Sequence, residues 1–116
     1  MIRRRGQAGA ATLLAVTMAG VLTVVATALA VVGAVVVAHR EAQAAADLAA
    51  LAGAAAAARG EDACQAARAL ALLNAGTVVA CALDGDTVTV EVRVPGPHWL
   101  GQHADLEAWA RAGPAP

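Results

Sequence analysis

The stretch LLAVTMAGVLTVVATALAVVGAVVV, residues 13–37, decides the fold of this chain. It holds 25 residues, and no charged residue occurs anywhere between Gly6 and Ala38. About 20 apolar helical residues cross the hydrocarbon core of a bilayer, so this stretch can span it with some tilt. A buried helix of a soluble protein is the alternative, but the rest of a 116-residue chain is too small to cover a helix that is apolar on every side. We therefore predict a transmembrane helix over residues 7–38.

The charges on either side of this stretch predict its orientation. Three arginines stand before it: Arg3, Arg4 and Arg5. The arginine after it, Arg40, is accompanied by Glu41 and Asp47. Because the flank richer in positive residues stays in the cytoplasm, we expect residues 1–6 to form a basic cytoplasmic leader. The protein is then a single-pass protein of the cell membrane with its C-terminus outside the cytoplasm.

A cleaved secretory signal is the alternative to a permanent anchor. It shares the basic start, and Ala42-Gln43-Ala44 offers small residues for cleavage. The apolar core of such a signal is typically about 7–15 residues, which is shorter than the stretch here. Release of a small secreted binding module after Ala44 stays open as an alternative.

Four alanines recur at every fourth position of the span: Ala26, Ala30, Ala34 and Ala38. Small residues at this spacing let two helix backbones approach closely in lipid. The alternative is chance, because the chain contains 35 alanines and the row drifts by about 40° per step on a helix. Packing of the membrane helix into a homo- or hetero-oligomer is thus one of two interpretations of the row.

The residues beyond the span predict an α+β fold. Residues 39–59 contain good helix formers and no proline, so we expect the membrane helix to continue outward until Gly60. A second helix is predicted over Ala63–Asn74, with Glu61-Asp62 before it and Gly76 after it. The extension over residues 39–59 would carry a small head over residues 60–112, to which the second helix belongs.

The later part of the head has strand periodicity. Four valines alternate with polar residues: Val88, Val90, Val92 and Val94. Asp84-Gly85 before them predicts a hairpin turn with the preceding valine-rich segment, and we expect Leu70 and Leu73 to cover the valine face. Residues 102–111 are compatible with a last short helix, and residues 113–116 with a disordered tail.

Cys64 and Cys81 face an oxidising compartment if this topology holds. A disulfide between them closes a loop of 16 intervening residues and would be worth about 3 kcal/mol in the chain-entropy model. Two buried thiols are the alternative. We expect the disulfide, because so small a head has little apolar core of its own.

The sequence offers little for catalysis, cofactors or nucleic acid. It contains no serine, only 2% aromatic residues and a formal charge of −1, which gives no electrostatic drive onto nucleic acid. His98, His103 and Asp105 lack a metal-specific spacing. We therefore expect a non-enzymatic protein without a metal or cofactor, in which Trp99 and Trp109 cover the core, anchor the head at the bilayer surface or meet a partner.

Two segments carry a family resemblance. RRRGQAGAAT at residues 3–12 precedes the apolar span, and AQAAADLAALA at residues 42–52 follows it. Together they resemble TadE/TadG-like proteins, most closely the small actinobacterial branch described as helicase/secretion-neighbourhood TadE-like. In that branch a helix that begins with a cysteine, a second cysteine in a strand, an Asp-Gly turn and a valine-rich strand follow in this order.

The resemblance implies a minor pilin-like or assembly component of a tight-adherence (Flp-type) pilus or a related secretion apparatus. Its partners would be the lipid bilayer and other pilin-like or Tad secretion proteins. Members of the wider family resemble prepilins, whose short basic leader is removed after a glycine, which corresponds here to cleavage between Gly6 and Gln7. Prepilins usually carry a glutamate five residues beyond the cut, where this sequence has Ala11. An accessory or regulatory subunit of another envelope complex is the alternative function.

Overall fold

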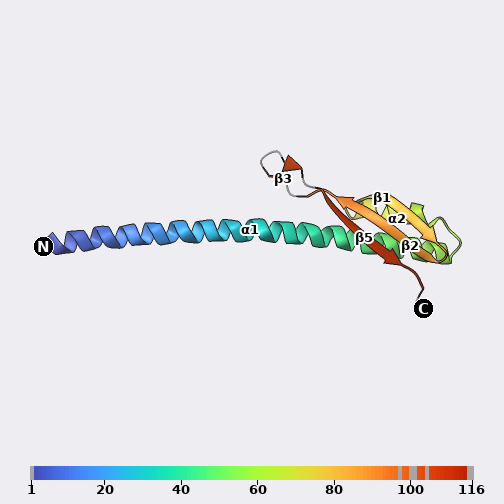
Figure 1. Ribbon diagram of the computed structural model, residues 1–116, viewed down its shortest axis with the longest axis horizontal. Helices are drawn as coiled ribbons and strands as arrows, with labels where there is room; N and C mark the ends of the chain where they lie inside the picture. Colours follow the sequence, from blue (N-terminus) through green and yellow to red (C-terminus); the bar gives the residue numbers. More distant parts are fainter. Residues whose placement is uncertain (1, 97, 100–101, 104, 115–116) are drawn as a thin grey trace. The chain divides into compact units, whose positions relative to one another are not determined.

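The computed structural model describes residues 2–96, 98–99, 102–103 and 105–114, and the side chains of residues 7–96 and 105–114. The chain divides into two compact units, Met1–Gly33 and Ala34–Pro116. The described elements, in chain order, are α1 (Ile2–Ala58), α2 (Ala63–Leu73), β1 (Thr77–Asp84), β2 (Thr87–Val94), β3 (His98–Trp99), β4 (Gln102–His103) and β5 (Leu106–Ala112) (Figure 1). Helix α1 begins in the first unit and ends in the second, which confirms the predicted continuation of the apolar helix.

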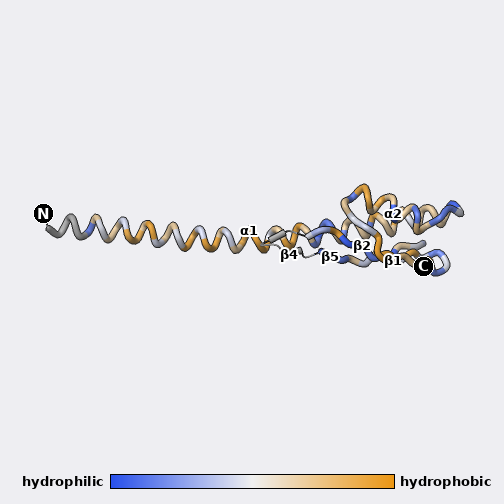
Figure 2. The backbone as a smooth tube through the Cα atoms, turned by 90° about the horizontal axis from the view of Figure 1, so that it is seen from above, coloured by the Kyte–Doolittle hydropathy of each residue, from blue (hydrophilic) through white to orange (hydrophobic). Residues whose placement is uncertain are grey.

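The first unit consists of α1 alone, and its described side chains are almost all solvent-exposed. Every side chain from residue 7 to residue 30 is exposed. Leu13, Leu22 and Val24 have exposed fractions of 70%, 64% and 69%, and Figure 2 shows apolar residues along most of this part of the helix. A helix that is apolar on every side is suited to lipid rather than to water.

The few polar side chains of this unit are satisfied within the helix. Four threonine hydroxyls each donate a hydrogen bond of 2.8–3.0 Å to the carbonyl oxygen four residues earlier: those of Thr12, Thr17, Thr23 and Thr27. In hydrocarbon an unpaired polar group costs several kcal/mol, so this local pairing removes the main obstacle to burying these residues in a bilayer.

The second unit is a two-layer α+β structure. Its three-stranded antiparallel sheet has the order β1-β2-β5, and two helical segments, residues 34–58 of α1 and all of α2, contribute to the core on one face. Helix α2 packs mainly against β1 and also against β2. On α1, the side chain of Gln43 donates a hydrogen bond of 3.1 Å to the main-chain oxygen of Trp109 in β5. The two helical segments therefore lie side by side, α2 towards β1 and α1 towards β5.

Strand β2 supplies the centre of the core. Its four valines alternate inward and are buried: Val88, Val90, Val92 and Val94. On β5, Ala108 and Ala110 pair in register with Val92 and Val90 and are buried as well. The predicted alternation is thus confirmed, and the hairpin closes through Gly85, whose φ of +59° favours glycine.

The helical layer meets this valine face through alanine. The buried alanines of α1 are Ala38, Ala42, Ala45, Ala46, Ala49, Ala50 and Ala56. The buried residues of α2 are Ala63, Ala67 and Ala71. Side chains this small let helix backbones approach each other and the sheet closely. At Gly53 the approach is so close that an added Cβ would lie 3.0 Å from the carbonyl oxygen of Ala63 and 3.0 Å from Cγ1 of Val88.

The predicted cover of the valine face by Leu70 and Leu73 is wrong. Leu73 is 81% exposed and Leu70 is half-buried, while the alanine face of α2 makes the contact with the core. The helix lies closer to its neighbours than leucine side chains would allow, so it turns these side chains away from the core.

The last short helix compatible with residues 102–111 is also absent from the described residues, because β5 occupies Leu106–Ala112. Its period is two: Leu106, Ala108, Ala110 and Ala112 face the core, whereas Glu107, Trp109 and Arg111 alternate with them on the other face. Alanine-rich composition suggests a helix, but pairing with β2 over seven residues fixes the segment as an edge strand.

The ends of α2 follow the predicted signals. The side chain of Asp62 accepts a hydrogen bond of 3.1 Å from the main-chain nitrogen of Gln65, which caps the N-terminus. Asn74 is the C-cap, and the main-chain nitrogen of Gly76 donates to the carbonyl oxygen of Ala71 over 2.8 Å. Between them Ala75 has a φ of +58°, a left-handed conformation that is unfavourable for alanine.

Candidate functional site

The candidate site in the first unit is the exposed apolar surface of helix α1. By length and composition α1 contains one stretch that is able to cross a membrane. Its exposed side chains are aliphatic residues and self-paired threonines, which offer van der Waals contact to lipid or to another helix. This surface can therefore anchor and pack.

The predicted leader and cleavage point lie at the beginning of α1. Residues 2–6 are helical, and the side chains of Arg3, Arg4 and Arg5 lie outside the described part of the structure. Gly6 and Gln7 are consecutive residues of the same helix, and the side chain of Gln7 is exposed. The orientation and the cleavage both stay predictions.

The alanine row has members of different accessibility. Ala26 and Ala30 are exposed, Ala34 is half-buried and Ala38 is buried at 9% exposure. Ala38 is therefore already covered within the second unit, whereas Ala26 and Ala30 are accessible to a neighbouring helix. Helix packing through this row stays a prediction, and Ala26 and Ala30 are the two residues through which it would occur.

Cys64 and Cys81 form a disulfide that joins the first turn of α2 to the middle of β1. Their Cα atoms are 5.9 Å apart, and both side chains are half-buried at the edge of the core. The bond fastens helix to sheet on the side of the head away from Gln43 and β5. It has no free thiol beside it, so its role is structural bracing.

The outer face of the sheet carries charged residues. The guanidinium of Arg93 on β2 donates to Glu107 on β5 over 2.6 Å, and this hydrogen bond and charge lower the pKa of Glu107. Partial burial raises the pKa of the neighbouring Glu91, and the hydrogen bond and charge of Glu107 raise it further. Trp109 stands opposite Glu91 in the register and is 59% exposed, so the core-covering role is wrong for this tryptophan.

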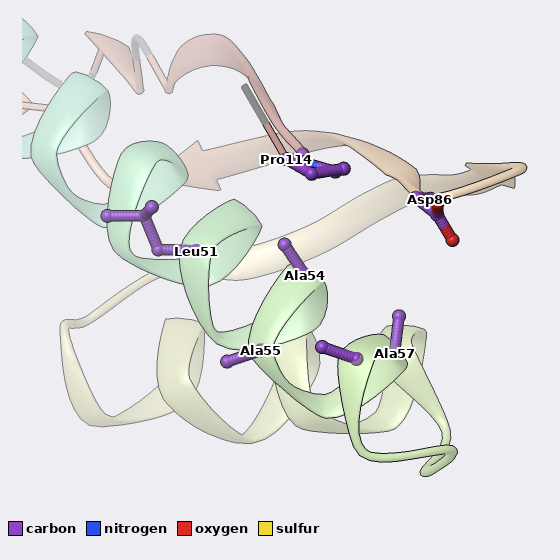
Figure 3. A pocket seen from close by; sticks show the side chains of 8 residues that line it. Leu51, Ala54, Ala55, Ala57, Asp86 and Pro114 are labelled. Atoms are coloured by element: carbon purple, nitrogen blue, oxygen red, sulfur yellow. The ribbon is translucent and has the colours of Figure 1, made fainter. Parts of the chain in front are cut away.

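A groove opens beside the far end of α1. It encloses about 510 Å³. The lining residues come from three segments, namely α1, the β1–β2 turn and the residues after β5: Leu51, Ala54, Ala55, Ala57, Ala58, Asp86, Gly113 and Pro114. Figure 3 shows side chains of α1 on one side, with Asp86 and Pro114 across from them. The groove is apolar apart from one carboxylate, which suits an aliphatic side chain better than a reacting substrate.

Sequence reasoning did not find this groove. Its three segments are separated by almost thirty residues each along the chain, and the groove exists only because β5 returns beside α1. Leu51, which projects from an otherwise alanine-rich helical surface, was the one signal available in the sequence.

The described side chains form no group of three histidine, cysteine, aspartate or glutamate residues that could hold a metal ion. Asp105 is exposed, while the side chains of His98, His103 and Trp99 lie outside the described part. Strands β3 and β4 pair His98 with His103 through their main chains.

The family described as putative Flp pilus-assembly TadE/G-like matches residues 9–57. This part of the chain is similar to that family. The match confirms the resemblance seen in the sequence and supports a role related to pilus assembly. Searches of curated proteins and of solved structures gave no match.

The TadE/G-like segment coincides with α1, ending one residue before the helix does. It includes both the exposed apolar stretch and the alanines that form the helical part of the core. The similarity to this family therefore lies within a single helix.

Proposed function

We propose that this chain is a minor pilin-like or assembly component of a Tad/Flp-type pilus or a related secretion apparatus. The observation that carries the proposal is that the TadE/G-like match lies within α1, the helix that contains the apolar stretch and part of the core of the head. Its mode of action is anchoring and packing rather than catalysis.

Anchoring follows from the chemistry of the first unit. Residues 13–37 place aliphatic side chains in the hydrocarbon, and the threonine hydroxyls need no partner from outside the helix. The three arginines at residues 3–5 hold the N-terminus in the cytoplasm. The head then lies on the other side, where the environment maintains the Cys64–Cys81 disulfide.

Packing against partner helices would use the accessible alanines. Ala26 and Ala30 are one turn apart and exposed, so another helix can approach the backbone there. The partners proposed are other pilin-like or Tad assembly helices in the same membrane.

The mass of the mature protein tests whether the leader is removed. Cleavage between Gly6 and Gln7 would remove six residues and leave the apolar stretch intact. With Ala11 in place of the usual glutamate, no carboxylate at that position would pair with the new terminal amine of a neighbour. Loss of the whole apolar stretch would instead identify a secreted module and refute the anchor.

Affinity purification of the tagged full chain from native membranes tests the role. We expect recovery of the Tad-type ATPase and platform proteins, and reduced recovery for an Ala26→Leu/Ala30→Leu variant because bulky side chains keep helices apart. Ala28→Leu is the matched control, since residue 28 lies on the other side of the helix from the row. Recovery solely with unrelated transporters would refute the pilus assignment and identify an accessory subunit of another complex.

A further inference from the structure

We propose that heads of this protein associate head-to-tail, with a leucine knob of one copy seated in the groove of another. The leucine knob is Leu72 and Leu73 at the end of α2, and the groove is the one beside α1 described above. This proposal concerns the second unit and does not depend on the pilus role.

The leucine knob is an apolar surface that the fold of the head does not use. Leu72 is 69% exposed and Leu73 is 81% exposed, although both belong to a helix whose opposite face is fully packed. Two adjacent leucines held on a rigid helix end are costly to leave in water, because their apolar surface favours burial. An exposed pair of this kind is typical of a contact surface.

The groove has the size and chemistry to receive such a pair. Its volume of about 510 Å³ lies within the range of about 300–1,000 Å³ that protein binding sites show. Leu51 and the alanines of α1 form one wall, and Pro114 faces them (Figure 3). The walls therefore present aliphatic carbon to the leucines.

Opposite charges accompany the two surfaces. Arg68 stands one helical turn before Leu72 on the same face of α2 and is exposed. Asp86, the one charged residue lining the groove, is exposed too. Within the described residues, neither side chain takes part in an ion pair, so each is available to the other across the contact. Charge complementarity thus points to a second copy of this chain as the occupant.

The positions of knob and groove make the contact open-ended. The knob is on α2, which packs against β1, whereas the groove lies on the other lateral side, between α1 and the residues after β5. Ala67 packs beside Gly53, and Leu72 lies five residues further along α2, which runs back along α1. Leu72 is therefore displaced by about 7.5 Å along the α1 axis, at 1.5 Å per helical residue, from the level of Gly53, which lies within the part of α1 that lines the groove. Two different surfaces joined with such an offset generate a staggered row rather than a closed dimer.

Cross-linking of cysteine variants of the full chain in detergent micelles tests the contact. One variant carries Leu73→Cys, which keeps Leu72 in the knob, and the other carries Ala58→Cys at the exposed rim of the groove. A short bismaleimide reacts with free thiols and not with the native disulfide. We expect it to give a yield of covalent dimer in the mixture at least tenfold above the yield from either variant alone. A matched mixture of Ala82→Cys, on the outer face of β1, with Ala58→Cys should give only background.

Dimers of Leu73→Cys alone or Ala58→Cys alone at the level of the mixture would show a symmetric contact and overturn the proposal. So would a mixture that stays at background.

Charge reversal gives a second and independent readout. In the same cross-linking pair, Arg68→Glu on the knob variant or Asp86→Arg on the groove variant should each lower the yield severalfold, and the two together should restore it. Absence of restoration would show that the two charges do not meet. Cross-linking without recovery of Tad proteins from membranes would refute the pilus role alone, whereas recovery without cross-linking would refute the head contact alone.

Discussion

A valine placed at Gly53 tests how closely α1 packs in the head. An added Cβ would lie 3.0 Å from the carbonyl oxygen of Ala63, 3.0 Å from Cγ1 of Val88 and 3.6 Å from Cβ of Ala67. The first of these atoms is main chain and cannot move without displacing α2. The second belongs to a valine with no exposed surface. Gly53→Val therefore pushes apart the two helices and the sheet at once.

Two opposing effects determine how much Gly53→Val changes the free energy of unfolding. Replacing glycine within a helix gains a few tenths of a kcal/mol in helix propensity when valine is introduced. Overpacking a close-packed core costs about 1–3 kcal/mol, and a branched side chain between main chain and a buried valine belongs in the upper part of that range. The net loss of unfolding free energy is therefore about 2 kcal/mol, which is about a thirtyfold change in the folding equilibrium.

Urea unfolding of the full chain in detergent micelles, followed by tryptophan fluorescence, measures this change because Trp109 lies on β5. For a domain of this size the transition midpoint should fall by about 1–2 M. Gly33→Val is the matched control, since nothing lies within 4 Å of a Cβ added there, and it should leave the midpoint unchanged. An unchanged midpoint for Gly53→Val would refute the close packing of α1 against α2 and β2.

Three further perturbations have defined outcomes. Ala75→Gly should raise the unfolding free energy by about 1 kcal/mol, because glycine adopts the φ of +58° without strain, and a lower midpoint would contradict this. Removal of the Cys64–Cys81 disulfide by paired alanine substitution should lower it by about 3 kcal/mol, and alkylation without reductant should leave both cysteines unlabelled by mass spectrometry; full labelling would refute the bond. Since Arg93 lowers the pKa of Glu107 in the folded state, the stability from this pair is present above the ordinary carboxyl pKa of about 4.3 and is lost as the pH falls through the lower folded value. Arg93→Gln should flatten the dependence of the urea midpoint on acid pH, and an unaltered profile would contradict the pairing.

The sequence predicted those features that depend on local pattern. The apolar stretch of residues 13–37, the cap at Asp62, the turn at Gly85 and the alternating valines of β2 each follow from composition or period over a few residues. The α+β class and the TadE-like resemblance followed from their order along the chain.

Features that depend on packing between distant segments could not be predicted from the sequence. Leu73 was expected in the core, but alanines in both helices bring the layers too close for it. Residues 106–112 contain four alternating apolar residues, three of which are alanines, a composition in which helix propensity competes with pairing to β2. The groove forms only when β5 has paired with β2, because the residues after β5 line it, so no local sequence pattern could have located it.

Cysteine labelling in intact cells most directly tests the central claim, that residues 13–37 cross the membrane and the head lies outside the cytoplasm. Ala82→Cys is exposed on β1, and Gln7→Cys stands before the apolar stretch, while the native cysteines are held in a disulfide. With a membrane-impermeant maleimide, we expect labelling of Ala82→Cys in intact cells and of Gln7→Cys only after permeabilisation. Labelling of Gln7→Cys in intact cells with Ala82→Cys protected, or recovery of the full chain in the soluble fraction, would contradict it.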